Sequence, residues 1–381
     1  MLYVPLPKCR IILAALLKKE VNLNLLAKFW SLDKSVDYWF SRSAWSLYSI
    51  VEFRKKVYRN KRVKVMIPDY FCNSALEPIR KTYVDIIFYP IKQNGKPNFS
   101  VFIDLISKSN PDIIIFVNYF GVTMGSSKMM SIAKKYDAWL VEDSTHCLMP
   151  QKDIGNFGDF VLYSPHKSLA IPDGALMIIR ESGPSHISKD FIRKEKFDQI
   201  YNSMISNEPK IRSFLWIWLA KRLLQKLGVS NKMRSVKFDN KLKEQGCRKM
   251  VHPKMSNFSA RLLNRMVSKL DIERKARKEN FLAWQSRLFK ITEVSLIYQY
   301  NQVSTPYLSV HSMPNLVTAK RVFESLNSIG LPVTTWPDLP PEVLENKKMH
   351  GDAIKMRYTQ LFLPVHSSIE NKKIYSIRIE G

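Results

Sequence analysis

The strongest constraint on the fold is an alternation of short apolar runs with polar, helix-like stretches between residues 61 and 179. The apolar runs are rich in β-branched residues and have the length of buried strands. The stretches between them are too long for hairpin turns and predict helical crossovers, so the pattern indicates an α/β fold with a mostly parallel central sheet flanked by helices. The expected strands are Val63–Ile67, Asp85–Tyr89, Ile113–Val117, Trp139–Glu142 and Phe160–Tyr163, and the expected helices cover 73–81, 100–107 and 126–135.

The character of the sequence changes after one more expected strand at 177–180. Residues 185–253 have the pattern of basic amphipathic helices. A long helix with at most one break is then expected from 257 to 288, with Ser256 as its N-cap. The remainder mixes strands near 307–310 and 360–363 with a helix near 315–329, which is typical of a smaller α+β domain. We therefore expect a large domain over 1–250, including the basic segment, and a small C-terminal domain over 251–381.

The charge of the chain favours anionic partners. Its 381 residues include 60 Lys and Arg against 33 Asp and Glu, a formal net charge of +27, and residues 185–253 alone hold 16 basic against 6 acidic residues. Nucleic acid, an anionic membrane surface and a phosphorylated small molecule all fit such a charge. No arginine-rich tail, aromatic RNA-binding pattern or zinc-finger spacing accompanies it, so we expect no nucleic-acid partner. The four cysteines form no CxxC pair, which predicts no metal site and favours a reducing cytoplasm.

Two apolar stretches raise the question of a membrane. The run 11–17 is followed directly by charged residues 18–20, so we expect an amphipathic helix that packs on the body rather than a signal peptide. Residues 211–227, with Trp216 and Trp218 among lysines and arginines, have the form of a helix lying on an anionic membrane. The same spacing also suits a helix that packs on a core or a dimer partner, and both interpretations stay open. Neither stretch has the roughly 18 apolar residues that a spanning helix needs.

One acid and one lysine follow neighbouring expected strands. The strand at 139–142 ends at Asp143, and the strand at 160–163 is followed by Lys167. Because ligands of open α/β sheets bind outside the carboxyl ends of the strands, we expect both side chains at one rim. A lysine can hold pyridoxal 5′-phosphate covalently, and a carboxylate can keep the pyridine nitrogen of that cofactor protonated. From the residues alone, Asp143 as a helix cap and Lys167 as a surface lysine are equally favoured.

The surrounding motifs resemble a known family. The sequences VEDSTHC, GNFGDF and YSPHKSLAIPDGALM are similar to the signature of the DegT/DnrJ-type, pyridoxal-phosphate-dependent sugar aminotransferases of fold type I. Further similarities follow in chain order, so the resemblance spans roughly residues 40–370. They are FSRSAWSL, IPDYFCNSA, VNYFG, KMSNFSARLLNRM and FLPVH. At the first of these, Arg42 and Trp45 stand where the family has small residues.

The resemblance implies pyridoxal 5′-phosphate as the cofactor, held covalently by Lys167. It also implies that Asp143 binds the pyridine nitrogen and that His146 lies near the ring hydroxyl. Its remaining implications are phosphate contacts from Ser164 and from the backbone amides of Ser43 and Ala44 at a helix N-terminus, and stacking on the ring by Tyr70 or Phe71.

The implied function is transfer of an amino group from an amino-acid donor to a nucleotide-linked keto sugar. Such a transferase would act in surface polysaccharide or amino-sugar biosynthesis, as a cytoplasmic homodimer with potential peripheral contact to the inner face of the membrane. Two alternatives stay open. One is a family member with a degenerate site that acts as a pyridoxal-phosphate-binding or regulatory protein. The other is a basic protein associated with a membrane surface.

Overall fold

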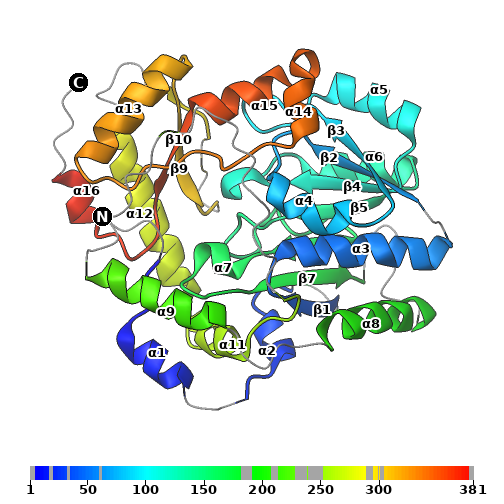
Figure 1. The fold of residues 1–381 in the computed structure, drawn as a ribbon, viewed down its shortest axis with the longest axis horizontal. Helices are drawn as coiled ribbons and strands as arrows, with labels where there is room; N and C mark the ends of the chain where they lie inside the picture. The colour runs from blue at the N-terminus through cyan, green and yellow to red at the C-terminus, as the bar shows by residue number, and fades with distance from the viewer. Residues whose placement is uncertain are drawn as a thin grey trace.

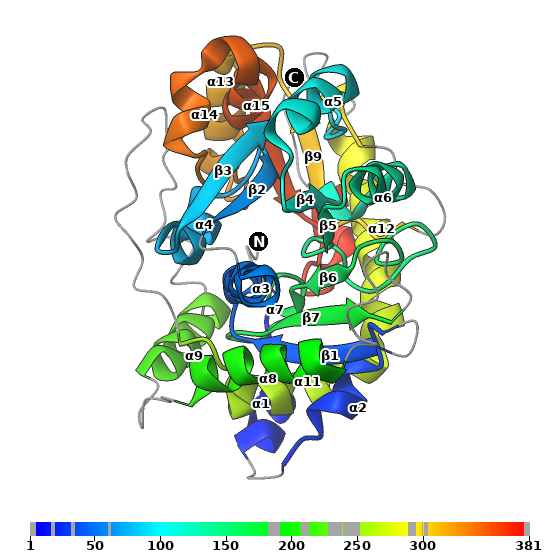
Figure 2. The same cartoon turned by 90° about the vertical axis from the view of Figure 1, so that its right-hand side faces the viewer.

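A seven-stranded sheet forms the centre of the computed structural model, and a three-stranded sheet lies toward the C-terminus (Figures 1 and 2). The structure describes residues 5–16, 20–31, 35–59, 62–181, 191–206, 213–227, 238, 252–288, 295–298, 300 and 304–376. The large sheet has the order β1-β7-β6-β5-β4-β2-β3. Its strands are β1 (Ser35–Phe40), β2 (Val63–Pro68), β3 (Val84–Tyr89), β4 (Ile113–Val117), β5 (Trp139–Asp143), β6 (Phe160–Tyr163) and β7 (Ala175–Arg180).

The mostly parallel sheet predicted from the sequence is confirmed. Strands β2 to β6 pair in parallel, and β7 runs antiparallel to β6 on one side and to β1 on the other. The expected strands between residues 61 and 179 all form, with ends within one residue of their predicted bounds. Strand β1 was not predicted. Its sequence, SVDYWF, has an acid and no apolar run, and it gains its place by pairing with β7, far along the chain.

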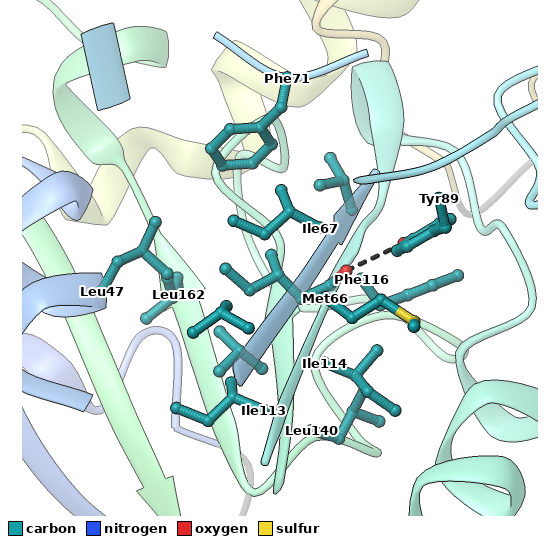
Figure 3. Packing of buried hydrophobic residues seen from close by; sticks show 14 of the residues in the cluster. Leu47, Met66, Ile67, Phe71, Tyr89, Ile113, Ile114, Phe116, Leu140 and Leu162 are labelled. Carbon is teal, nitrogen blue, oxygen red and sulfur yellow. Dashed lines mark hydrogen bonds between the residues drawn. The ribbon is translucent and has the colours of Figure 1, made fainter. Parts of the chain in front are cut away.

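Helices cover both faces of the large sheet. In Figure 2, α3 and α4 lie on one face, whereas α5 and α6 lie on the other. Between the layers, apolar side chains such as those of Ile67, Ile114, Phe116, Leu140 and Leu162 form the main core (Figure 3). The helices of this half are α1 (Cys9–Leu16), α2 (Leu23–Ala27), α3 (Ser43–Tyr58), α4 (Asn73–Arg80), α5 (Phe99–Ser109), α6 (Ser126–Lys135), α7 (Pro165–Ser168), α8 (Phe191–Ile205) and α9 (Ser213–Lys226).

The long helix expected from 257 to 288 is broken, as anticipated. Helix α11 (Asn257–Asn264) is followed by a short 3-10 turn, η3 (Val267–Lys269), and then by α12 (Leu270–Leu288). Ser256 caps α11 as predicted, because its side chain accepts the Ser259 N–H. Apolar residues of α11 pack in a cluster with α1, α2 and β7, while α12 packs with the small sheet. The proposed domain boundary at residue 250 stays a prediction.

The small sheet has the order β10-β9-β8 and is antiparallel. The strands and helix predicted for this part of the chain form near their expected bounds. Its elements are β8 (Ser295–Leu296), β9 (Leu308–Ser312), α13 (Leu316–Ser328), α14 (Pro341–Glu345), α15 (Lys347–Thr359), β10 (Gln360–Pro364) and α16 (Asn371–Tyr375).

Polar contacts join the C-terminal half to the large sheet. The Asp338 carboxylate accepts the N–H groups of Asn73 and Ser74, at 3.1 and 3.3 Å, and so caps the start of α4. Behind this cap, the buried carboxylate of Asp69 lies 2.9 Å from Nδ1 of His350 on α15. Burial raises the pKa of Asp69, and His350 opposes that shift. The end of β2 is therefore fixed by residues from the other end of the chain.

The turn between β5 and β6 is built around Glu142. Its fully buried carboxylate accepts three backbone N–H groups, from Gly155 at 2.7 Å, Phe157 at 3.0 Å and Gly158 at 3.1 Å, and the Asn118 amide at 3.0 Å. A buried carboxylate is tolerated only when its oxygens are paired in this way. These contacts hold the GNFG segment against the end of β5 and fix where β6 begins.

We predict that Gly155→Ala destabilises the protein by about 3 kcal/mol. Gly155 has a φ of +86°, and an added Cβ would lie 2.0 Å from the hydroxyl oxygen of Tyr163, which is fully buried and has no room to move. Backbone strain and overlap therefore add. Urea unfolding measures the loss in the free energy of unfolding.

Gly330→Ala is the matched control. Gly330 has a similar φ of +77°, but an added Cβ would meet no heavy atom within 4 Å. Only the backbone strain applies, so we expect a loss of about 1 kcal/mol. Equal losses at the two positions would show that the Tyr163 contact contributes nothing.

Candidate active site

The carboxyl ends of β5 and β6 meet at one rim of the large sheet. The strands are parallel neighbours, with Asp143 in register with Leu162. The chain leaves β6 at Ser164 and enters α7, which carries Lys167. Asp143 is buried and the Lys167 side chain is half-buried. The sheet therefore brings the predicted acid and lysine to the same edge.

Thr145 joins the two groups. The Lys167 ammonium donates to Oγ1 of Thr145 at 2.9 Å, and the Thr145 N–H donates to Oδ1 of Asp143 at 3.0 Å. Burial lowers the pKa of Lys167, while the negative charge of Asp143 opposes that change. The lysine thus holds its proton less tightly than a surface lysine does. No sequence pattern indicated Thr145, because its role depends on a contact between two loops.

His146 lies between two aromatic rings. Its ring is stacked on Tyr307, with centroids 4.7 Å apart and planes at 7°, and on Phe120, at 5.4 Å and 27°. Nδ1 accepts the Phe120 N–H at 3.3 Å. Burial and the nearby charge of Lys167 hold the pKa of His146 well below its usual range. The imidazole is therefore neutral, and its remaining proton is on Nε2.

Arg277 of α12 links the segment after Lys167 to the segment that carries Tyr307. Its guanidinium is buried and donates to the carbonyl of Ser168 at 2.8 Å and to that of Tyr307 at 3.1 Å. The same side chain forms an ion pair with Glu273 at 2.8 Å. It therefore positions the residue after Lys167 and the ring that stacks on His146. Arg277 was not singled out from the sequence.

A second group of polar residues lies where β1 and β6 end on either side of β7. Phe40 is in register with Ala175, and Tyr163 with Leu176, so Ser41 and Ser164 follow the two strands at the same edge. The Ser164 hydroxyl is buried and has no hydrogen-bond partner among the described residues. This unpaired group marks the edge as a place where a polar ligand would be satisfied.

Helix α3 starts beside this edge at Ser43 and Ala44. Its N-cap residue, Arg42, makes no side-chain hydrogen bond to the helix. The first N–H groups of a helix have no partner within it and carry a partial positive charge, so they favour an anion. The phosphate contacts implied for Ser43, Ala44 and Ser164 are thus gathered at one place.

Arg42 adds a full positive charge there. Its guanidinium donates to the carbonyls of Ser41 at 2.9 Å and Pro172 at 3.1 Å. It lies near enough to His166 and Lys167 to lower the pKa of both. The positive charge of Arg42, with the carboxylate of Asp173 also nearby, lies at a helix start where a phosphate would bind. From the sequence, Arg42 was only a departure from the family pattern.

The aromatic residues expected on the cofactor ring lie in the core. Tyr70 is fully buried and stacks on Trp336, with centroids 4.3 Å apart, whereas Phe71 is slightly exposed at the edge of the main cluster (Figure 3). The next residue, Cys72, lies close enough to Lys167 that each group affects the pKa of the other. The stacking role of Tyr70 or Phe71 stays a prediction.

The fold and this rim define a class of enzyme, the pyridoxal-phosphate-dependent enzymes of fold type I. The sequence profile of the DegT/DnrJ/EryC1/StrS aminotransferase family matches residues 64–333, so the chain belongs to that family. It is a pyridoxal-phosphate-dependent aminotransferase. No curated protein matches the sequence.

Solved structures of sugar aminotransferases share the fold. Helicobacter pylori PseC, an aminotransferase involved in the biosynthesis of pseudoaminic acid, superposes with a TM-score of 0.69 at 13% identity, over 98% of this chain and 96% of that one. The putative sugar aminotransferase Spr1654 from Streptococcus pneumoniae, in its PMP form, gives 0.71 at 12% identity over the same shares. A putative PLP-dependent aminotransferase from Bacillus cereus gives 0.67 at 15% identity, over 98% and 96%.

We predict that Arg277→Met costs about 3–5 kcal/mol of stability. The substitution leaves Glu273 buried without its cation and removes the donor to the Ser168 and Tyr307 carbonyls. Thermal unfolding and urea unfolding both report the loss.

Arg274→Met is the control in the same helix. Arg274 forms an ion pair with Asp271 in which both side chains are exposed, so its loss changes stability by less than about 1 kcal/mol. If Arg277→Met unfolded at the same urea concentration as Arg274→Met, the buried ion pair would contribute no more to stability than the exposed one, and the prediction would be wrong.

Proposed function

We propose that this aminotransferase moves an amino group from an amino-acid donor to a nucleotide-linked keto sugar, with Lys167 and Asp143 as the central residues. The observation that carries the assignment of residues is the chain of contacts from Lys167 through Thr145 to Asp143. This chain of contacts supports a common site in which the Lys167 amine and the Asp143 carboxylate both act on the cofactor ring. When bound, pyridoxal 5′-phosphate supplies an electron sink that stabilises negative charge on the carbon that loses a proton.

Lys167 is proposed to bind the cofactor aldehyde and, when freed, to carry a proton to or from the substrate. Both tasks need the neutral amine. The lowered pKa of Lys167 raises the share of neutral amine near neutral pH. Thr145 accepts from the amine and so directs it, while its N–H holds the Asp143 carboxylate in place.

Asp143 is proposed to keep a proton on the pyridine nitrogen. Neutral His146, with its proton on Nε2, is proposed to donate that proton in a hydrogen bond to the ring hydroxyl. The stacking of His146 on Phe120 and Tyr307 fixes the plane of its ring and hence the direction of this bond.

The phosphate is proposed to bind at the start of α3. Ser164 offers a buried, unpaired hydroxyl, Ser43 and Ala44 offer backbone N–H groups, and Arg42 offers a positive charge. For the ring face, Phe71 is favoured over Tyr70, because Trp336 already stacks on Tyr70. These groups fit the cofactor in charge and in hydrogen-bonding capacity.

A nucleoside-diphosphate sugar fits the net charge of +27, because its diphosphate is anionic. We further propose that the product serves surface polysaccharide or amino-sugar biosynthesis, and that the enzyme acts as a homodimer in the cytoplasm.

The test uses a panel of nucleoside-diphosphate keto sugars with glutamate. We expect one or more sugars to yield an amino sugar and 2-oxoglutarate, and the protein with added cofactor to absorb at the edge of the visible range. Lys167→Ala should lose both signals, since the covalent attachment and the mobile proton depend on this amine. Mass spectrometry of the sugar and absorbance spectroscopy give the two measurements.

Lys152→Ala is the control, because Lys152 is exposed and lies in the turn between β5 and β6, away from the β5 and β6 carboxyl ends. It should keep both signals. Full absorbance and turnover in Lys167→Ala would remove Lys167 from the site. Glutamate-dependent turnover of free sugars alone would reject the nucleotide-linked substrate and leave the aminotransferase assignment intact.

In the cofactor-free protein, the contribution of Lys167 to stability should become more favourable as the pH rises toward 10.5, the ordinary pKa of a lysine. In the folded state the pKa of Lys167 is lower than in the unfolded chain, so between the two values this residue binds more protons in the unfolded chain. The free energy of unfolding of the wild type, relative to that of Lys167→Met, therefore rises with pH in that interval. Urea unfolding of both proteins across this range measures the difference, and Lys152→Met should follow the wild type at every pH. A difference that stays constant would contradict the prediction.

A further inference from the structure

Helix α9 exposes a large apolar face. Its side chains Leu215, Trp218 and Leu219 pack partly against the cluster that contains α1, α2 and α11. The opposite side of the helix exposes Trp216 at 70% and Leu223 at 59%, seven residues apart and therefore on one face. The neighbouring exposed apolar side chains on this side are Ile217, Leu224 and Leu227.

Helix α1 lies next to α9 and also exposes apolar side chains. The Lys226 ammonium near the end of α9 contacts Sγ of Cys9 at the start of α1, at 2.9 Å. Helix α1 in turn exposes Leu13 at 66% and Leu16 at 49%. Both helices lie on the same side of the molecule, at the lower left in Figure 1. We call this surface, formed by the exposed residues of α1 and α9, the α1–α9 face.

Positive charge surrounds these apolar side chains. Exposed cations lie on α9, at Lys221 and Lys226, and at the start of α1, at Lys8 and Arg10. Neither helix contains an aspartate or a glutamate. A helix that lies at the interface of an anionic bilayer typically exposes apolar side chains flanked by lysines or arginines. Helices α1 and α9 have this pattern and contain no acidic residue.

We propose that the α1–α9 face docks on the surface of a lipid bilayer that contains anionic lipid. Trp216, Leu223 and Leu13 enter the interfacial region, and the lysines contact the phosphates of the headgroups. A second copy of the chain is a poorer partner, because a symmetric contact would bring the same cations of both copies together. Among the described residues no helix is long and apolar enough to cross a membrane, so the proposed contact is with the surface only.

The exposure of Trp216 argues against one interpretation left open by the sequence, in which the helix packs on its own core. A helix that packs on its own core would bury both tryptophans, whereas here only Trp218 packs inward, edge-on to Phe258. Trp216 points away from that contact. The proposal does not depend on the substrate of the aminotransferase and can fail or succeed independently of it.

Flotation of the full-length protein with vesicles tests the proposal. We expect binding to vesicles of phosphatidylcholine with phosphatidylglycerol, and at least about tenfold weaker binding to phosphatidylcholine alone, given the contribution of several cations. High salt should weaken the binding to anionic vesicles. The variant Trp216→Gln/Leu223→Gln should bind about tenfold or more weakly, and Lys221→Gln about fivefold.

Tyr83→Gln is the matched control. Tyr83 is an exposed aromatic residue, at 82%, that lies just before β3, outside the α1–α9 face. Its substitution should leave vesicle binding unchanged. Circular dichroism and aminotransferase activity should match the wild type in every variant, since none of these residues belongs to the active site.

Three results would overturn the proposal. The first is flotation of the Trp216→Gln/Leu223→Gln variant equal to that of the wild type, and the second is equal binding of the wild type to neutral and anionic vesicles. The third is a fall in molar mass, measured by light scattering, from dimer to monomer in this double variant. That change would assign the face to a contact between two copies.

Discussion

The buried carboxylate of Glu142 is the interaction on which the geometry of the active site depends. A charge removed from water needs partners, and here three backbone amides and the Asn118 side chain supply them. Those partners come from the ends of two other segments, so the position of the charge decides where the segments lie. Asp143 is the next residue, and Lys167 follows the strand that the same turn begins. One structural carboxylate therefore sets the spacing between two functional groups.

Much of the central fold could be predicted because its signals are local. Short apolar runs at crossover spacing identified β2 to β6, and Ser256 identified the start of α11. Because neighbouring parallel strands end at one edge, the same reasoning brought Asp143 and Lys167 together before any contact was known. Strand β1 was missed, because its place depends on pairing with β7 and on packing against residues far along the chain, such as Phe197 and Tyr201.

The missed residues of the candidate site share a physical cause. Thr145, Arg42 and Arg277 act through contacts between segments that are distant in sequence or that meet only at a loop. No periodicity or spacing encodes such contacts. The register of residues 70–72 is a similar case, because a loop without a repeating pattern does not determine which side chain turns inward. The sequence offered an anionic membrane as one possible partner of residues 211–227, and the structure adds which side chains of α9 are exposed.

The pairing of Asp69 with His350 has a consequence for how the protein is made. These residues are 281 positions apart, and the buried acid at the end of β2 lies 2.9 Å from the ring Nδ1 of the later residue. During translation, the first half of the chain leaves the ribosome long before its partner exists. The sheet can assemble early, but the contact at the carboxyl end of β2 forms only when synthesis is nearly complete. A chain cut short before residue 350 would thus carry an acid buried in an unfinished enzyme, a feature that cellular quality control can recognise.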